Sequence, residues 1–62
     1  MYQCFDHNQT LLQPGDWVCY IDPQSDREQE GSITNCLEHN LVTIDAEEGI
    51  ITVNAHDCYN LP

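Results

Sequence analysis

A turn and the strand that follows it decide the predicted fold: residues 13–21, with the sequence QPGDWVCYI. Pro-Gly is a strong turn signal, and the aromatic and β-branched residues that follow it favour a strand. Because side chains alternate across a strand, the two predicted faces are Val18 and Tyr20 on one side, and Trp17, Cys19 and Ile21 on the other. The same alternation recurs along the chain, so the sequence predicts an all-β protein.

Four further strands are predicted C-terminal to this stretch, over residues 32–37, 41–45, 50–54 and 59–61. The segments between them are predicted as a long polar loop (22–30), a tight turn (38–40), a hairpin turn (47–49) and one helical turn (55–58). Five short strands in so small a chain are expected to close into a small barrel, which removes sheet edges. Tyr2 and Phe5, in the N-terminal arm, are expected to cap an open end of that barrel.

The length of 62 residues allows one domain, and a domain of this size buries only about 60% of the surface that its unfolded chain exposes. Such domains often need a disulfide, a metal or a partner subunit for stability. Oligomerisation through edge strands is therefore one hypothesis for this chain. The small core also leaves no room for a deep cleft.

The charge balance is strongly acidic, with eleven acids against one base, Arg27, and a formal net charge of −10. Nucleic acids and anionic membranes would repel such a chain, because their binding requires basic patches. The expected partners are a basic protein surface, a cationic peptide or metal ions. Solubility alone is the simpler explanation of the acids, although this charge exceeds what solubility requires.

The N-terminal residues 1–20 lack the basic start and the continuous apolar stretch of a signal peptide. No apolar run reaches the length of a membrane span. We therefore expect a cytoplasmic protein, in which the four cysteines stay reduced as free thiols or metal ligands. Two disulfides, in any of three pairings, are the alternative that a secreted protein would favour.

Residues 12–62 resemble the SH3-like small barrels of the KOW and Tudor group. The segments that carry the resemblance are Pro14-Gly15-Asp16-Trp17-Val18, Gly31-Ser32-Ile33, Leu41-Val42-Thr43-Ile44, Gly49, Val53, Ala55-His56-Asp57-Cys58 and Leu61. The resemblance implies a five-stranded barrel over 12–62, a 3₁₀ turn before its last strand, and an N-terminal arm, 1–11, that packs on it. It says little about function, because this barrel hosts many unrelated roles.

Known activities of that group fit the sequence poorly. KOW-type RNA contacts use basic loops, whereas the long loop here is acidic. Tudor-type readers of cationic peptides need an aromatic cage, for which Trp17, Tyr59 and Tyr2 are the candidates. The small-barrel reductases carry Val-Gln-Ile-Tyr in the fourth strand, where this chain has residues 51–54, ITVN. That activity is therefore not expected.

The acids in the loops and on strand faces are the favoured functional site. They are predicted to bind a basic protein surface and to imitate a nucleic-acid backbone, in the manner of inhibitors from phages and mobile elements that occupy a basic site on a host nucleic-acid-processing protein. Long-range attraction would make such binding fast and sensitive to salt. The predicted partner-binding residues are Asp22, Asp26, Glu28, Glu30, Asp45, Glu47 and Glu48, with Trp17 and Tyr59 as apolar anchors.

A zinc-stapled domain is the alternative hypothesis. The chain repeats the pattern Cys, apolar, acid, His at 4–7 and at 36–39. Two such pairs, Cys4 with His7 and Cys36 with His39, supply the ligands of a tetrahedral zinc site if the arm folds over the barrel. Against this reading, the chain has no Cys-x-x-Cys motif, and strand alternation is expected to point Cys36 outward.

Catalysis is not expected, and no cofactor other than zinc is implied. A reactive cysteine needs an electropositive setting that lowers its pKa, and this chain is strongly negative. Paired carboxylates perform acid–base chemistry only when one of them is desolvated, whereas the acids here lie in solvated loops. The sequence therefore predicts a binding protein and not an enzyme.

Overall fold

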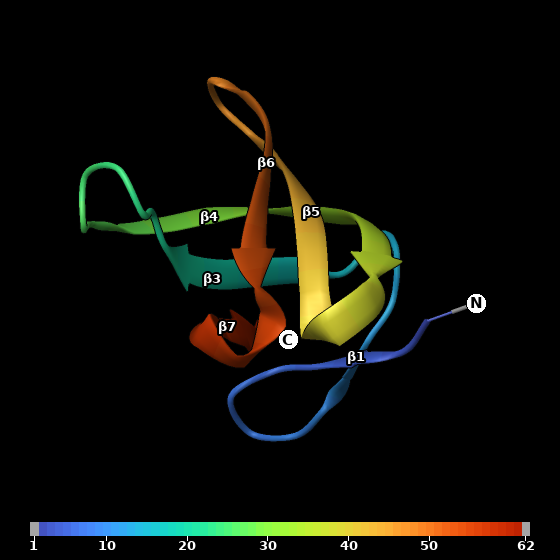
Figure 1. Ribbon diagram of the computed structural model, residues 1–62. Coiled ribbons are helices and arrows are strands. Elements are labelled where there is room, and N and C mark those ends of the chain that lie inside the picture. The colour runs from blue at the N-terminus through green and yellow to red at the C-terminus, as the bar shows by residue number, and fades with distance from the viewer. Residues whose placement is uncertain (1, 62) are drawn as a thin grey trace.

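The computed structural model describes residues 2–61, and this part of the chain is all-β (Figure 1). Its seven strands are β1 (Cys4–Phe5), β2 (Leu11–Leu12), β3 (Trp17–Ile21), β4 (Glu28–Leu37), β5 (Leu41–Ala46), β6 (Gly49–Asn54) and β7 (Cys58–Asn60). Two 3₁₀ turns separate strands, η1 (Glu38–Asn40) before β5 and η2 (Ala55–Asp57) before β7. The all-β prediction is confirmed, and so is the single helical turn before the last strand.

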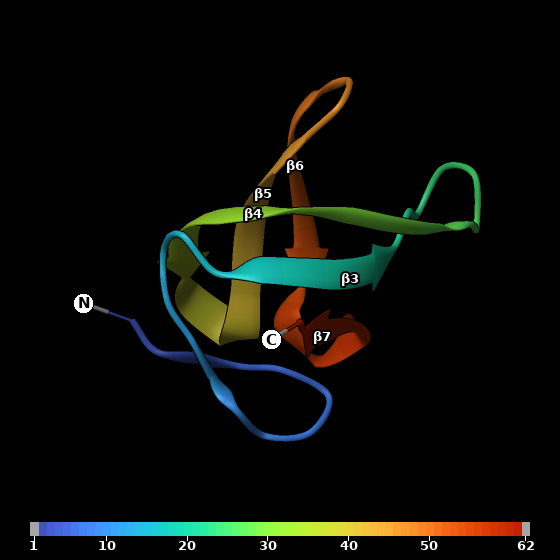
Figure 2. The same cartoon turned by 180° about the vertical axis from the view of Figure 1, so that it is seen from behind.

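Five of the strands form one antiparallel sheet in the order β6-β5-β4-β3-β7. The sheet curls, so that β3 and β4 run across β5 and β6 (Figures 1 and 2). Its two edge strands, β6 and β7, do not pair with each other in the described chain. The predicted five-stranded sheet is therefore present, but the complete closure expected of a barrel is not.

The two faces of β3 are those that alternation predicts. Val18 and Tyr20 are buried, whereas Trp17 and Ile21 are exposed. Cys19 lies on the outer face but is nearly buried, because its neighbours in the sheet, Glu30 on β4 and Tyr59 on β7, flank it on both sides. The alternation of side-chain direction along the strand was enough to predict which residues of β3 face the core.

Strand β4 differs from the prediction in two ways. It begins at Glu28, so the preceding loop is shorter than expected, because residues 28–31 continue the ladder with β3. The register with β5 also shifts between Ile33 and Asn35, which marks a β-bulge at this point. After the bulge Cys36 pairs with Val42, a fully buried residue, and is itself half-buried. The bulge therefore turns Cys36 inward, where uniform alternation placed it outside.

Strands β4 and β5 approach closely at Gly31. A Cβ atom at this position would lie 2.5 Å from Ile44 Cγ2 and 3.0 Å from the Asp45 carbonyl oxygen, so only glycine fits here.

The hydrophobic core lies inside the curled sheet. It consists of Cys4, Leu12, Val18, Tyr20, Ile33, Val42, Ile44, Val53, Ala55 and Cys58. The arm thus contributes Cys4 and Leu12 to the core, and its two-stranded sheet spans the predicted boundary between residues 11 and 12. Tyr2 and Phe5 are exposed, so the expectation that they cap the barrel is wrong.

Two polar side chains dock the arm. Asp6 is 3% exposed, and its carboxylate accepts hydrogen bonds from the backbone N–H groups of Asn8 (2.9 Å), Thr10 (2.8 Å) and Asn60 (3.0 Å). The Asn40 side chain accepts from the Phe5 N–H at 2.8 Å and donates to the Phe5 carbonyl at 3.2 Å. These bonds bring the arm against η1 and β7. None of the described residues forms a helix that is long and apolar enough to cross a membrane.

Candidate functional site

The N-terminal arm does fold back to Cys36, as a zinc site would require. The thiol of Cys4 donates to the Leu41 carbonyl at 3.2 Å, and that of Cys36 donates to the Leu12 carbonyl at 3.6 Å. Cys4 pairs with Leu12 across the β1–β2 sheet, so the two thiols are neighbours. The structure therefore brings together the two predicted sulfur ligands.

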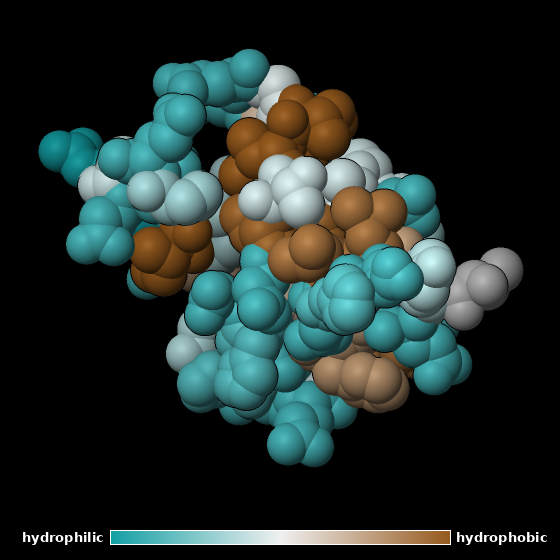
Figure 3. All heavy atoms as spheres, viewed as in Figure 1, coloured by the Kyte–Doolittle hydropathy of each residue, from teal (hydrophilic) through white to brown (hydrophobic). Residues whose placement is uncertain are grey.

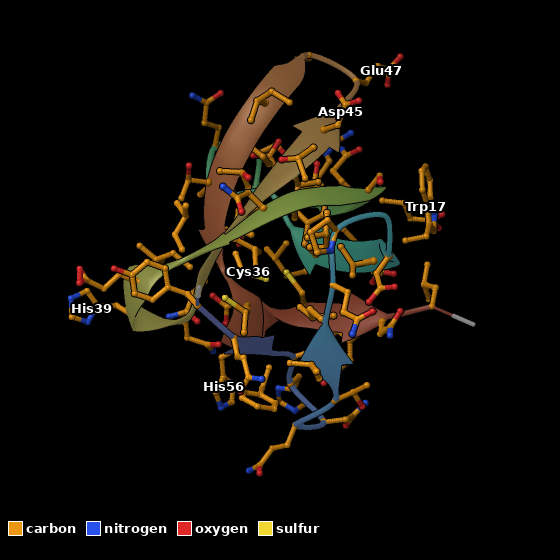
Figure 4. The ribbon with its side chains drawn as sticks, turned by 90° about the vertical axis from the view of Figure 1, so that its right-hand side faces the viewer. Trp17, Cys36, His39, Asp45, Glu47 and His56 are labelled. Atoms are coloured by element: carbon orange, nitrogen blue, oxygen red, sulfur yellow. The ribbon has the colours of Figure 1, made fainter. Side chains whose placement is uncertain are left out.

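The two predicted histidine ligands lie elsewhere. The His39 side chain is 83% exposed and faces away from Cys36 (Figure 4). The His7 ring packs against Tyr59, with ring centroids 4.8 Å apart, and against His56 at 5.5 Å. Within residues 2–61, no group of three or more potential ligands could hold a metal ion. The four residues of the predicted site are thus not assembled in this fold.

Two cysteine thiols on the inner side of the sheet are held in their neutral form. Burial, followed by the hydrogen bond with Cys4, raises the pKa of Cys36 to about 11. Burial and the charge of Asp57 raise the pKa of Cys58 to about 12. Thiols with such pKa values are weak nucleophiles at neutral pH, because the thiolate is the reactive form. These side chains therefore serve as small apolar groups of the core.

Five of the nine predicted partner-binding residues share one face of the sheet. Across β3 and β4 the outward pairs are Ile21 with Glu28, Cys19 with Glu30, and Trp17 with Ser32. The row through Trp17 and Ser32 continues to Asp45 on β5, and Cys19 pairs with Tyr59 on β7. We call this surface the acidic outer face; it consists of Trp17, Ile21, Glu28, Glu30, Asp45, Ile50 and Tyr59. Figure 4 shows Trp17 and Asp45 on one side of the molecule and His39 on the opposite side.

Trp17 is held in place on the acidic outer face. Its indole Nε1–H donates to Glu30 Oε1 at 2.9 Å, yet half of the residue remains exposed. A tryptophan whose orientation is fixed before binding loses little conformational entropy when a partner covers it. Exposed tryptophans are also frequent hot spots of protein interfaces. The hydrogen bond therefore presents an apolar ring next to a carboxylate.

The acids of the acidic outer face form no ion pair within the described residues. Among residues 2–61, the only contact that qualifies as an ion pair joins His39 and Glu38, at 3.8 Å on another part of the surface. Burial, a hydrogen bond with Glu28 and the charges of Glu28 and Glu30 together raise the pKa of Cys19 to about 11. The negative charges of Glu28 and Glu30 thus disfavour ionisation of the Cys19 thiol next to them.

The other predicted acids lie on the two loops at one end of the sheet. Asp22, Glu47 and Glu48 line a pocket of about 470 Å³ between the β3–β4 loop and the β5–β6 turn, which we call the end pocket. Figure 3 shows these two loops as a hydrophilic rim next to a hydrophobic patch over β5 and β6. Asp26 is exposed on the β3–β4 loop, with a φ of 57°. The nine predicted residues therefore divide between two surfaces and one loop.

Sequence reasoning missed several members of these surfaces. Ile50 is 61% exposed and pairs with Asp45, so it extends the acidic outer face; the predicted hairpin was the signal that could have found it. Tyr20 lines the end pocket although it belongs to the core. The ring contact of Tyr59 with His7 had no signal in the sequence. Tyr2 lines a separate groove with Leu11 and Leu37, apart from the other two candidates for an aromatic cage, Trp17 and Tyr59.

Comparisons with known proteins leave the function to be argued from these surfaces. No family model matches the chain, and neither curated proteins nor solved structures give a significant match.

Proposed function

We propose that this chain is a non-enzymatic, cytoplasmic module that binds a basic surface of another protein through its acidic outer face. We also propose that its sheet is an open variant of the SH3-like barrel. The order β6-β5-β4-β3-β7, with the 3₁₀ turn η2 before the last strand, supports this assignment. Such barrels carry many roles, so the function rests on the surface and not on the fold.

The single observation that carries the proposal is the hydrogen bond from Trp17 to Glu30 on an otherwise uncompensated acidic surface. Aromatic anchors supply affinity, and charges around them supply fast association and partner choice. Glu28, Glu30 and Asp45 are exposed acids on the same face, with Ile21, Ile50 and Tyr59 as exposed apolar contacts. This combination suits a lysine- and arginine-rich surface that has an apolar centre.

The partner class that we favour is a protein whose basic surface binds nucleic acid. Phosphate-binding sites concentrate lysine and arginine side chains, and an acidic protein that competes for them inhibits nucleic-acid binding. The net charge of −10 favours rapid, salt-sensitive association with such a site. The chain would then act as an inhibitor that mimics nucleic acid, as phage and mobile-element proteins do.

The test is a capture experiment with the immobilised chain, carried out at about 50 mM and about 500 mM salt, between which charge screening increases strongly. Captured proteins are then challenged with a 30-base-pair DNA duplex. We expect specific proteins to be retained at low salt, released at high salt, and displaced by the duplex. Retention that is indifferent to both salt and duplex would contradict the proposal.

Two variants with equal net charge make the experiment specific to the acidic outer face. Glu30→Gln with Asp45→Asn removes two charges from this face, whereas Glu38→Gln with Asp57→Asn removes two exposed charges elsewhere. We expect the first variant to lose at least about tenfold in affinity for the captured protein, because it changes interface contacts as well as total charge. Equal losses in both variants would show that only net charge matters.

A further inference from the structure

The end pocket has a tyrosine in its wall whose ring is buried and whose hydroxyl forms no hydrogen bond with the described residues. Tyr20 is only 3% exposed, and it lines the pocket together with Asp22, Gln29, Glu47 and Glu48. No hydrogen bond from the described residues reaches the Tyr20 hydroxyl, and this oxygen is not sealed off in the core. Buried polar groups are normally hydrogen-bonded, so the hydroxyl faces the pocket and is available to a ligand there.

The charges around this hydroxyl are of one sign. Burial is the main cause that raises the pKa of Tyr20, and the charges of Asp22 and Glu48 add to it, which indicates that these carboxylates lie near the hydroxyl. The Asp22 carboxylate already accepts hydrogen bonds from the Gln24 N–H at 3.0 Å and the Ser25 hydroxyl at 3.1 Å. Glu47 and Glu48 accept none from the described residues and lie on the exposed β5–β6 turn. The rim therefore offers free carboxylates above a neutral hydroxyl.

The walls of the end pocket include apolar as well as polar groups. Ala46 and Ile51, both half-buried, contribute the apolar part, and Pro23, Gln24 and Thr52 complete the lining. A volume of about 470 Å³ lies within the usual range of small-molecule sites, roughly 300–1,000 Å³. An alkyl chain that ends in a cationic nitrogen matches both features, because its stem packs on Ala46 and Ile51 while its head meets the carboxylates.

We propose that the end pocket is a binding site for an alkylammonium or alkylguanidinium group, with the Tyr20 hydroxyl as a hydrogen-bond acceptor and Glu47 and Glu48 as counter-charges. Such a group has two sources, a free polyamine or the side chain of a lysine or arginine on a partner protein. The proposal is independent of the acidic outer face, since the two surfaces share no residue. A carboxylate ligand would be repelled at the same place.

The test uses heteronuclear NMR titration of the whole chain with three probes at constant ionic strength. Spermidine represents the free polyamine, Nα-acetyl-lysine methylamide represents the side chain, and acetate is the anionic control. We expect saturable shifts for the cations, confined to Tyr20, Asp22 and residues 46–52, and none for acetate. A tighter response to spermidine assigns the site to a polyamine, and a tighter response to the lysine derivative assigns it to a partner side chain.

Single-residue variants distinguish binding in the end pocket from general attraction of cations to a negatively charged protein. Tyr20→Phe keeps the buried ring and removes the hydroxyl, and we expect it to weaken cation binding by about threefold to tenfold. Glu48→Gln is expected to have a similar effect, whereas Glu38→Gln, with the same change in net charge, changes affinity less than about twofold. Glu30→Gln with Asp45→Asn should change cation affinity by less than Glu48→Gln does, so a failed capture experiment would not remove this site. Equal weakening by Glu38→Gln and Glu48→Gln, or shifts spread over the surface, would overturn the proposal.

Discussion

Two ends of this molecule use acidic side chains in opposite ways. At the arm end, Asp6 is buried and accepts three backbone hydrogen bonds, two from within the arm and one from Asn60 on β7. At the opposite loop end, Glu47 and Glu48 are exposed and accept none from the described residues. The same chemical group thus stabilises the fold at one end and is left free for a partner at the other. Four predictions test this contrast, beginning with the largest expected effect.

Replacing Asp6 with Ala should cause the largest loss of stability. Three backbone N–H groups lose a charged acceptor, and one of them, on Asn60, belongs to a strand 54 residues away. We expect the free energy of unfolding to fall by about 3 kcal/mol, measured by urea denaturation. Asp57→Ala is the matched control, because Asp57 is exposed, and it should change stability by less than about 0.5 kcal/mol. Equal effects of the two variants would refute the structural role of Asp6.

Alkaline pH should weaken the arm end next. The Cys58 thiol has a folded pKa of about 12 against an ordinary value of 9.0, because burial and nearby acids disfavour the thiolate. Since this pKa is raised on folding, its contribution is complete below pH 9 and is lost as the pH rises toward 12. Between pH 9 and 10.5 the loss from Cys58 is about 1.6 kcal/mol, because the slope rises from half its full value at pH 9 toward about 1.4 kcal/mol for each pH unit.

This pH effect is measured as the slope of unfolding free energy against pH. Cys58→Ala removes the titrating group, so the slope above pH 9 should become shallower even if the variant is less stable at neutral pH. The slope that remains belongs to the thiols of Cys19 and Cys36, whose pKa values are raised to about 11, and to Tyr20, whose pKa burial and nearby acids also raise. An unchanged slope in Cys58→Ala would mean that this thiol is not buried in the folded state.

Asn40→Ala tests the second contact of the docked arm. Asn40 has a φ of 58°, a backbone conformation that asparagine tolerates better than alanine, and its side chain makes two hydrogen bonds with Phe5. We expect a loss of about 1.5 kcal/mol, together with faster hydrogen exchange in residues 4–12. Asn8→Ala serves as the control, because the Asn8 side chain is exposed and forms no hydrogen bond within the described residues. If hydrogen exchange in residues 4–12 is as slow in Asn40→Ala as in the unaltered chain, the arm does not depend on this contact.

Neutralising the loop end should have the smallest effect on stability. Glu47→Gln with Glu48→Gln removes two exposed charges from a protein of net charge −10, so relief of repulsion should keep the change within about 0.5 kcal/mol of zero. The dependence of melting temperature on salt should become weaker in this variant, because screening has less repulsion to remove. A loss above about 1 kcal/mol would show that these acids support the fold, contrary to the comparison.

The sequence by itself determined the strand pattern and the sign of the surface. The alternation in residues 17–21 orients Trp17 and Ile21 outward and Val18 and Tyr20 inward, because side-chain direction in a strand is a property of neighbouring residues. The glycine in Glu47-Glu48-Gly49 located the hairpin turn between β5 and β6, and its φ is 128°. Charge is additive along the chain, so the acidic surface was equally predictable. That five of the predicted partner residues share one face depends on the register of β3, β4, β5 and β7, which the sequence did not predict.

Tertiary structure alone decided how distant residues meet. The bulge in β4 turns Cys36 inward through its pairing with β5, and no pattern in the neighbouring residues predicted this bulge. The repeated Cys-x-acid-His pattern predicted a common site, yet packing brings the cysteines together and leaves His7 against Tyr59 and His39 in solvent. The docking of Asp6 and Asn40 spans 54 and 35 residues. Such contacts depend on the curvature of the whole sheet, and the alternation of residues along each strand does not determine that curvature.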